Sequence, residues 1–183
     1  MPYVRLEPLR LMLIVITGNG KGKTTSALGQ ALRAVGDQRR AIMFQFIKGP
    51  WRSGEDESVK RLGPDFKIIK GGKGFVGILG DSLPRAEHVK AAQKTWARGK
   101  KAVASGKYDL VIFDELNVAL KLRLLKLADI LSFLKKHKNR LDIMVTGRGA
   151  AKTLISIGDL VSEVREVKHP FGKGLKAKRG VEY

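Results

Sequence analysis

The sequence predicts an α/β protein of three layers, in which a mostly parallel sheet of about six strands carries helices on both faces. Short apolar runs rich in β-branched residues alternate along the chain with longer segments of helical periodicity. The runs are apolar almost throughout, which is typical of strands that are buried on both faces. The 183 residues are enough for one domain, spanning 1–183, and too few for two.

Each element is predicted from its own pattern. Three segments have helical periodicity, and the stripe of Val89, Ala92, Trp96 and Val103 in the longest of them is an example. The glycine-rich stretch 48–84, which contains the short predicted strand 66–69, has little helical or strand periodicity. We expect a flexible, substrate-facing loop region there. The predicted strands are 11–16, 41–47, 66–69, 109–113, 141–146 and 161–167, and the predicted helices are 24–35, 84–104 and 124–137.

Composition limits the classes of function. The chain has no cysteine, so any metal must be held by oxygen or histidine ligands. The apolar run at 11–16 is too short for a membrane span and is followed too soon by glycines for a secretory signal, so we expect a cytoplasmic protein without a membrane partner. The net charge of +19 is spread along the chain, which favours capture of small polyanions over nucleic acid binding.

The most informative motif is a glycine-rich loop between the first predicted strand and the first predicted helix. It reads Thr17-Gly18-Asn19-Gly20-Lys21-Gly22-Lys23-Thr24-Thr25. Glycines let backbone N–H groups converge on phosphate oxygens, and the following helix adds its positive end. In this context the loop predicts a P-loop NTPase-like fold that binds ATP, with Lys23 on the phosphates and the Thr24 hydroxyl on Mg²⁺. Thr17 stands where the usual pattern has its first glycine, so the cradle differs from that of an ordinary ATPase.

Two further motifs follow predicted strands and therefore lie at the same edge of the sheet. The strand at 109–113 leads into Asp114 and Glu115, whose carboxylates are ligands suited to Mg²⁺. In a simple NTPase Glu115 would polarise a water molecule, and Asn117 nearby is placed to orient a ligand. Arg148, in the run TGRG at 146–149, either stabilises phosphate charge or only borders the site.

Taken in order, the motifs resemble the ATP:cob(I)alamin (corrinoid) adenosyltransferases of the P-loop type. The resemblance covers nearly the whole chain and is specific as a combination. Its segments are TGNGKGKTT at 17–25, FQFIKG at 44–49, FDELN at 113–117, TGRG at 146–149, GDLVSE at 158–163, KHPF at 168–171 and GLKAKRGVEY at 174–183.

The resemblance implies a transferase in which the cobalt(I) of a corrinoid attacks the 5′ carbon of ATP and triphosphate leaves. It implies that the loop from Gly18 to Thr25 holds phosphates in a reversed orientation, that Thr24 and Glu115 serve Mg²⁺, and that Lys23 and Arg148 offset the triphosphate charge. It also implies a homodimer that receives electrons from a flavoprotein reductase.

One segment departs from the family pattern. Similar proteins carry a run like Gly-Phe-Thr-Trp-Glu-Thr, whose aromatic rings face the corrin, whereas this chain reads GFVGILGD at 74–81. Phe75 matches the first aromatic residue, but Gly77 takes the place of the tryptophan. This departure leaves open a carrier that binds corrinoid or nucleotide without turnover. The positive charge and the sheet pattern leave open a second alternative, a P-loop ATPase that acts on nucleic acid.

Overall fold

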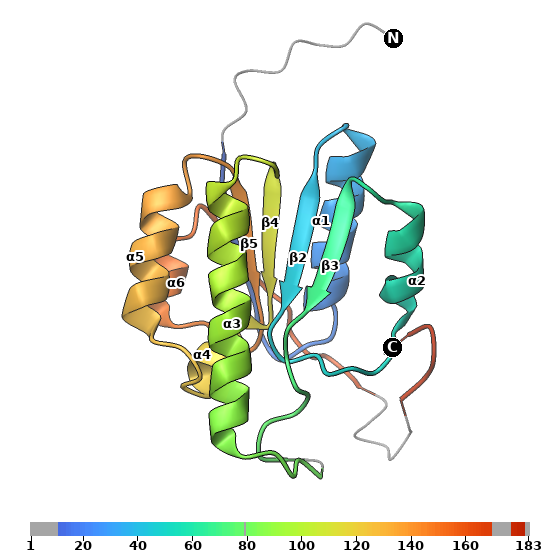
Figure 1. The fold of residues 1–183 in the computed structure, drawn as a ribbon, viewed down its shortest axis with the longest axis vertical. Helices are drawn as coiled ribbons and strands as arrows, with labels where there is room; N and C mark the ends of the chain where they lie inside the picture. Colours follow the sequence, from blue (N-terminus) through green and yellow to red (C-terminus); the bar gives the residue numbers. More distant parts are fainter. Residues whose placement is uncertain (1–10, 79, 170–176, 182–183) are drawn as a thin grey trace, which may run out of the picture.

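A computed structural model describes residues 11–78, 80–169 and 177–181 of the protein (Figure 1). Its centre is a six-stranded sheet of order β3-β2-β4-β5-β1-β6, and every pair of neighbouring strands is parallel. All six predicted strands are confirmed, with bounds shifted by a few residues. They are β1 (Leu13–Thr17), β2 (Ala41–Gln45), β3 (Phe66–Lys70), β4 (Leu110–Asp114), β5 (Asp142–Thr146) and β6 (Leu160–Glu163).

Helices cover both faces of the sheet, as predicted. In Figure 1, α3 crosses the front of the sheet, α4 to α6 lie beside it, and α1 and α2 lie on the other side. The three predicted helices are confirmed as α1, α3 and α5, whereas the three short helices were not predicted. The bounds are α1 (Lys23–Gly36), α2 (Gly54–Arg61), α3 (Arg85–Ala104), α4 (Leu116–Lys121), α5 (Leu127–His137) and α6 (Lys152–Ile157).

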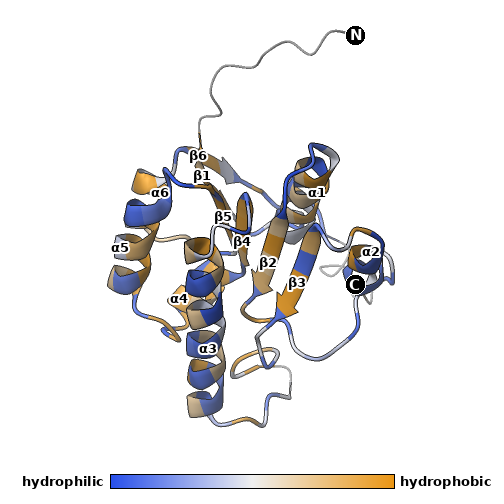
Figure 2. Ribbon diagram, turned by 45° about the horizontal axis from the view of Figure 1, so that its top comes forward, coloured by the Kyte–Doolittle hydropathy of each residue, from blue (hydrophilic) through white to orange (hydrophobic). Residues whose placement is uncertain are grey.

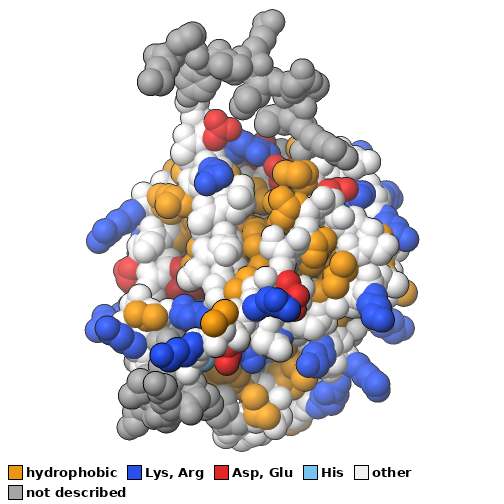
Figure 3. Space-filling view, turned by 180° about the vertical axis from the view of Figure 1, so that it is seen from behind, with side chains coloured by type: hydrophobic (Ala, Val, Ile, Leu, Met, Phe, Trp, Pro, Cys, Tyr) orange, Lys and Arg blue, Asp and Glu red, His pale blue; other side chains and the backbone are white. Residues whose placement is uncertain are grey.

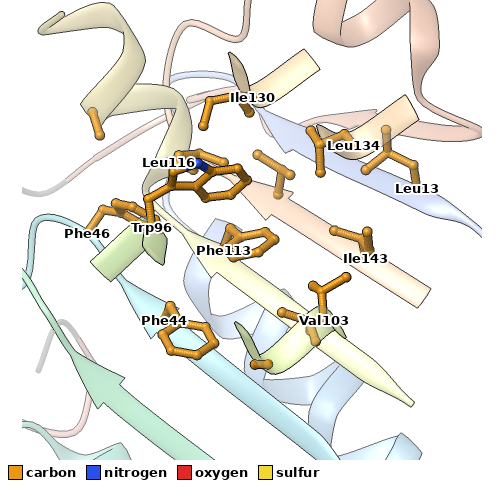
Figure 4. Close-up of a cluster of buried hydrophobic side chains, with 14 of the residues drawn as sticks. Leu13, Phe44, Phe46, Trp96, Val103, Phe113, Leu116, Ile130, Leu134 and Ile143 are labelled. Carbon is orange, nitrogen blue, oxygen red and sulfur yellow. The ribbon is translucent and has the colours of Figure 1, made fainter. Parts of the chain in front are cut away.

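The core lies on both faces of the sheet because successive strand residues point to opposite sides. Leu13 and Val15 belong to the cluster under α3 to α6, whereas Ile14 and Ile16 pack on the side of α1. Phe113 lies in the middle of the first cluster, with the Trp96 ring centroid 5.1 Å away (Figure 4). The strands are accordingly the most apolar part of the ribbon (Figure 2). This buried sheet fixes the positions of the loops that follow its strands.

The structure differs from the prediction in the stretch 48–84. Its first part contains α2, whose residues are not fully buried and therefore give no apolar stripe to detect. The helix is instead stabilised at its start by a capping box, in which the Ser53 backbone N–H donates to Asp56 over 2.8 Å. Lysines on both sides hold it: Lys48 pairs with Glu55 and Lys70 with Asp56. Of the described residues between 71 and 84, none lies in a helix or strand.

The charge of the protein is dispersed over the face opposite α3. There, most Lys and Arg side chains lie near the outline of the face, and apolar and uncharged surface separates them from one another (Figure 3). No helix within the described ranges combines the length and the apolar character that crossing a bilayer requires.

Candidate active site

The glycine loop connects β1 to α1 and rests on the chain that follows β6. The Gly20 N–H donates to the carbonyl oxygen of Val164 over 2.8 Å, and the Val164 N–H donates to that of Thr17 over 2.8 Å. Gly18 has a φ of +97°, and a Cβ atom there would lie 2.3 Å from the Val164 oxygen. Only glycine fits this position, because both the backbone angle and the space exclude a side chain. The loop therefore has a shape that two segments far apart in the sequence determine together.

Lys23 is the cation at the centre of this loop. Its side chain is 5% exposed, and Nζ donates a hydrogen bond of 2.6 Å to the carbonyl oxygen of Gly20. Burial lowers the pKa of Lys23, and the charge of Arg148 lowers it further, while Glu115 acts in the opposite direction. Asn19 and Lys21, which belong to the same loop, are exposed.

The two threonines that begin α1 have different partners. The Thr24 hydroxyl donates to Oδ1 of Asp114 over 3.0 Å. The Thr25 hydroxyl donates instead to the carbonyl oxygen of Gly22 over 2.9 Å, next to the positive-φ turn at Gly22 that closes the loop. Thr24 thus connects the loop to β4, whereas Thr25 stabilises the loop itself.

The carboxylate of Asp114, at the end of β4, is hydrogen-bonded to residues of α1, β2 and β5. Besides Thr24, Oδ1 accepts a hydrogen bond of 2.7 Å from the Thr146 hydroxyl, and Oδ2 accepts one of 3.3 Å from Nε2 of Gln45. The side chain is buried, and burial raises the pKa of Asp114 against the effect of these three hydrogen bonds. Gln45 and Thr146 were not predicted as site residues. The signal that was available is that each ends its strand with a polar side chain.

Glu115 follows with a left-handed backbone, at a φ of +60°. Its N–H donates to the Thr146 hydroxyl oxygen over 3.0 Å, which holds the turn in place. Burial, and then the neighbouring Asp114 charge, raise the pKa of Glu115 to about 7, although Lys23 and Arg148 lower it. The carboxyl group is therefore placed among the cations of the site and is about half ionised at neutral pH.

Asn117 holds the turn that follows the next strand, β5. Nδ2 of the buried Asn117 donates to the carbonyl oxygen of Gly147 over 3.1 Å. Gly147 has a φ of +125°, and a Cβ atom there would lie 3.1 Å from that of Asn117. Asn117 thus supports the turn that carries Arg148, whose side chain is exposed.

A pair of exposed aromatic rings lies at the β2 and β3 end of the same sheet edge. Trp51 is 59% exposed and Phe75 is 47% exposed, and their ring centroids are 6.1 Å apart at an angle of 32°. The indole lies on backbone without side chains: Cβ atoms at Gly49 and Gly74 would lie 2.8 and 2.6 Å from its carbons. Trp51 was missed from the sequence because 24 positions separate it from Phe75. Its available signal was a tryptophan just beyond a strand end.

The glycine loop opening a helix, with a strand-end aspartate hydrogen-bonded to its threonine, defines a P-loop nucleotide-binding protein. The flagellar accessory protein FlaH from Methanocaldococcus jannaschii is similar in fold, with a TM-score of 0.54 and 13% identity over 83% of this chain and 70% of that one.

Within this class, residues 10–183 match the model of the ATP:corrinoid adenosyltransferase BtuR/CobO/CobP family. The corrinoid adenosyltransferase of Escherichia coli K12 and CobA of Salmonella typhimurium are each 36% identical over 95% of this chain and 86% of their own. That of Pseudomonas aeruginosa is 36% identical over 95% and 84%. The chain belongs to this family of transferases. Part of the family-like C-terminal segments, including Phe171, Lys176 and Glu182, lies outside the described residues.

Proposed function

We propose that this protein transfers the 5′-deoxyadenosyl group of ATP to the cobalt(I) of a corrinoid. The electron pair of cobalt(I) forms a bond to C5′, the C5′–O bond breaks, and triphosphate leaves with the bonding pair. The observation that supports this most is that one sheet edge carries both a phosphate loop around Lys23 and the exposed ring pair of Trp51 and Phe75. Membership in the family supports the same reaction.

In the ATP half of the site, we assign binding to the loop from Gly18 to Thr25 and charge stabilisation to Lys23 and Arg148. The negative charge of the leaving triphosphate grows during the reaction, and preorganised cations stabilise it without having to reorganise. Alkyl transfer needs no activated water molecule. A Glu115 carboxyl group that is half protonated at neutral pH, with Lys23 beside it, suits a site in which hydrolysis is not wanted.

The residues of this site fit Mg²⁺. Within the described ranges no three His, Cys, Asp or Glu side chains gather to hold a metal on their own. Mg²⁺ is typically held by one or two carboxylates together with a hydroxyl group and substrate phosphates. The Thr24 hydroxyl and Asp114, 3.0 Å apart, with Glu115 adjacent, provide such a set. When bound, the ion would neutralise part of the triphosphate charge.

In the corrinoid half of the site, we propose that the corrin ring lies on the exposed rings of Phe75 and Trp51, which together we call the aromatic face. The two rings would exclude water from one face of a bound corrin, and Trp51 would take the role for which Gly77 has no side chain. We also propose a homodimer in the cytoplasm that is supplied with electrons by a flavoprotein reductase. Sedimentation and reduction assays with a purified reductase test these two partners.

The test of the function is an incubation with ATP, Mg²⁺ and chemically reduced cobalamin. We expect the visible absorbance of a cobalt–carbon bond, and chromatography should show triphosphate in equal amount. ADP and phosphate stimulated by DNA would instead identify a nucleic-acid-dependent ATPase. Saturable binding of both ligands without a cobalt–carbon bond would identify a carrier.

A further inference from the structure

A basic cavity of about 510 Å³ adjoins the aromatic face. Its walls are the segment after β2, the segment after β3, and one side of α3. In Figure 1 these elements lie at the strand ends where α3 extends past the sheet. Its rim is continuous with the ring pair, because Gly49 lines the cavity and the Trp51 indole, which pairs with Phe75, packs directly against Gly49. A ligand lying on the rings therefore has this cavity within reach.

The charge of the cavity is strongly positive. Lys90, Lys94 and Arg98 follow each other at intervals of four and therefore share one side of α3. Lys73, from the segment after β3, lines the same cavity. Like charges at this spacing destabilise a helix. None of these four cations forms an ion pair with a carboxylate of the described residues, whereas Lys70 in the same wall is paired with Asp56. The cations are thus available to a bound anion.

The inner end of the cavity is built from close backbone contacts. A Cβ atom at Gly71 would lie 1.9 Å from the Thr95 hydroxyl oxygen, and one at Gly72 would lie 2.4 Å from the carbonyl carbon of Ile47. Both glycine N–H groups donate to the carbonyl oxygen of Gln45. Gln45 thus binds the base of the cavity through its carbonyl oxygen and the carboxylate of Asp114 through its side chain.

We propose that this cavity binds the phosphodiester group of the corrinoid's nucleotide loop while the corrin ring lies on Trp51 and Phe75. The inference rests on the proposed function. The amide side chains of a complete corrinoid are neutral, so its phosphodiester is the anion that four free cations would select. The triphosphate of ATP has its own cations in Lys23 and Arg148. The cavity therefore distinguishes complete corrinoids from those that lack the nucleotide loop.

The experiment compares cobalamin with cobinamide, which lacks the phosphodiester. For Lys94→Glu we expect KM for cob(I)alamin to rise at least about tenfold, with kcat, KM for ATP and KM for cobinamide unchanged. Lys101→Glu, an exposed change on the same helix away from the cavity, is the matched control. Glu87→Gln removes the one acidic side chain of the lining and should lower KM for cobalamin alone, a gain that misfolding cannot produce.

Three results would overturn the inference: equal losses for both corrinoids, no loss for either, or a loss of oligonucleotide binding alone. The equilibrium affinity for cob(II)alamin and cob(II)inamide, followed by absorbance, gives the same comparison without turnover. If the wild-type protein adenosylates neither corrinoid but Lys94→Glu still weakens cob(II)alamin selectively, the proposed function fails and the cavity assignment stands. If the wild-type protein adenosylates both corrinoids and Lys94→Glu changes KM for cobalamin and for cobinamide equally, the cavity assignment alone fails.

Discussion

The hydroxyl group of Thr24 donates a hydrogen bond of 3.0 Å to Oδ1 of Asp114, although 90 positions separate the two residues. The contact joins the start of α1 to the end of β4 across β5, which lies between β1 and β4 in the sheet. Thr146, the last residue of β5, donates to the same oxygen atom and completes the bridge. The phosphate loop and the strand-end carboxylates are therefore one connected unit.

Replacing Asp114 by asparagine should remove the negative charge of this side chain while keeping its hydrogen bonds. The amide oxygen can keep the hydrogen bonds from Thr24 and Thr146, and the new amide nitrogen can donate to Oε1 of Gln45 if that side chain turns over. That oxygen is buried and has no partner among the described residues. We expect a folded protein whose Mg²⁺-dependent adenosylation falls about 100-fold. Activity titrated against Mg²⁺, with circular dichroism as the check on folding, measures both parts. A variant with normal metal dependence would contradict the assignment.

Loss of the Lys23 charge should act mainly on the leaving triphosphate. For Lys23→Ala we expect kcat/KM for ATP to fall by about 100-fold or more, because a preorganised cation is removed from a buried position. Lys107→Ala, an exposed lysine after α3 at the opposite edge of the sheet, is the matched control. Steady-state assays of triphosphate release measure kcat/KM for both variants. Equal effects of the two changes would refute the assignment of Lys23 to the leaving triphosphate.

The raised pKa of Glu115 predicts a pH dependence of stability. Because the folded value of about 7 exceeds the ordinary 4.5, the folded protein binds more protons than the unfolded chain between these values. The free energy of unfolding should thus fall as pH rises through this window, by at most about 3 kcal/mol from this group. Glu115→Gln cannot ionise, so its stability should match the wild type below this window and exceed it above. Urea denaturation across the window tests this, and parallel curves would rule it out.

The aromatic face predicts a graded response at Trp51. Trp51→Ala removes most of the ring surface, so we expect KM for the corrinoid to rise about tenfold with KM for ATP unchanged. Trp51→Phe keeps a ring against Phe75 and should restore most of the affinity. The absorbance of bound cob(II)alamin, which reports its axial ligand, should shift less in Trp51→Ala than in the wild type. Identical spectra in all three proteins would show that Trp51 does not face the corrin.

Alanine should change the stability of the protein in opposite directions at Gly18, in the glycine loop, and at Gly29, in the helix that follows it. Gly18→Ala places a Cβ atom against Val164 at a φ of +97°, so we expect a loss of about 1–3 kcal/mol in stability and a weaker affinity for ATP. Gly29 lies within α1 with open space around it. Gly29→Ala should raise stability by about 0.5–1 kcal/mol and leave ATP binding unchanged. Thermal melts with and without ATP provide the comparison.

Much of the fold could be predicted because a buried parallel sheet requires continuous apolar runs. The strands at 109–113 and 141–146 were visible for this reason. The helix α2 was not, because its stability comes from a polar cap and ion pairs instead of an apolar stripe. The pattern of Ser53 followed three residues later by Asp56 was the local sign of that cap.

The site was predicted in parts but not as an assembly. The loop around Lys23 and the pair Asp114 and Glu115 were found because their order along the chain is diagnostic. Which carboxylate meets Thr24 depends on the register of three strands, and that is set by packing across the whole sheet. The contact of Trp51 with Phe75 depends likewise on how two loops leave the sheet edge.

The support of the glycine loop by the chain after β6 has a consequence during protein synthesis. The loop is synthesised well before Val164, the residue that supports it through backbone hydrogen bonds. A nascent or truncated chain that stops before β6 has the full glycine sequence but lacks this support. ATP should therefore bind such chains more weakly and stabilise, by mass action, those in which β6 has joined the sheet. In the cell, the nucleotide would protect molecules that contain β6 from proteolysis more than fragments that lack it.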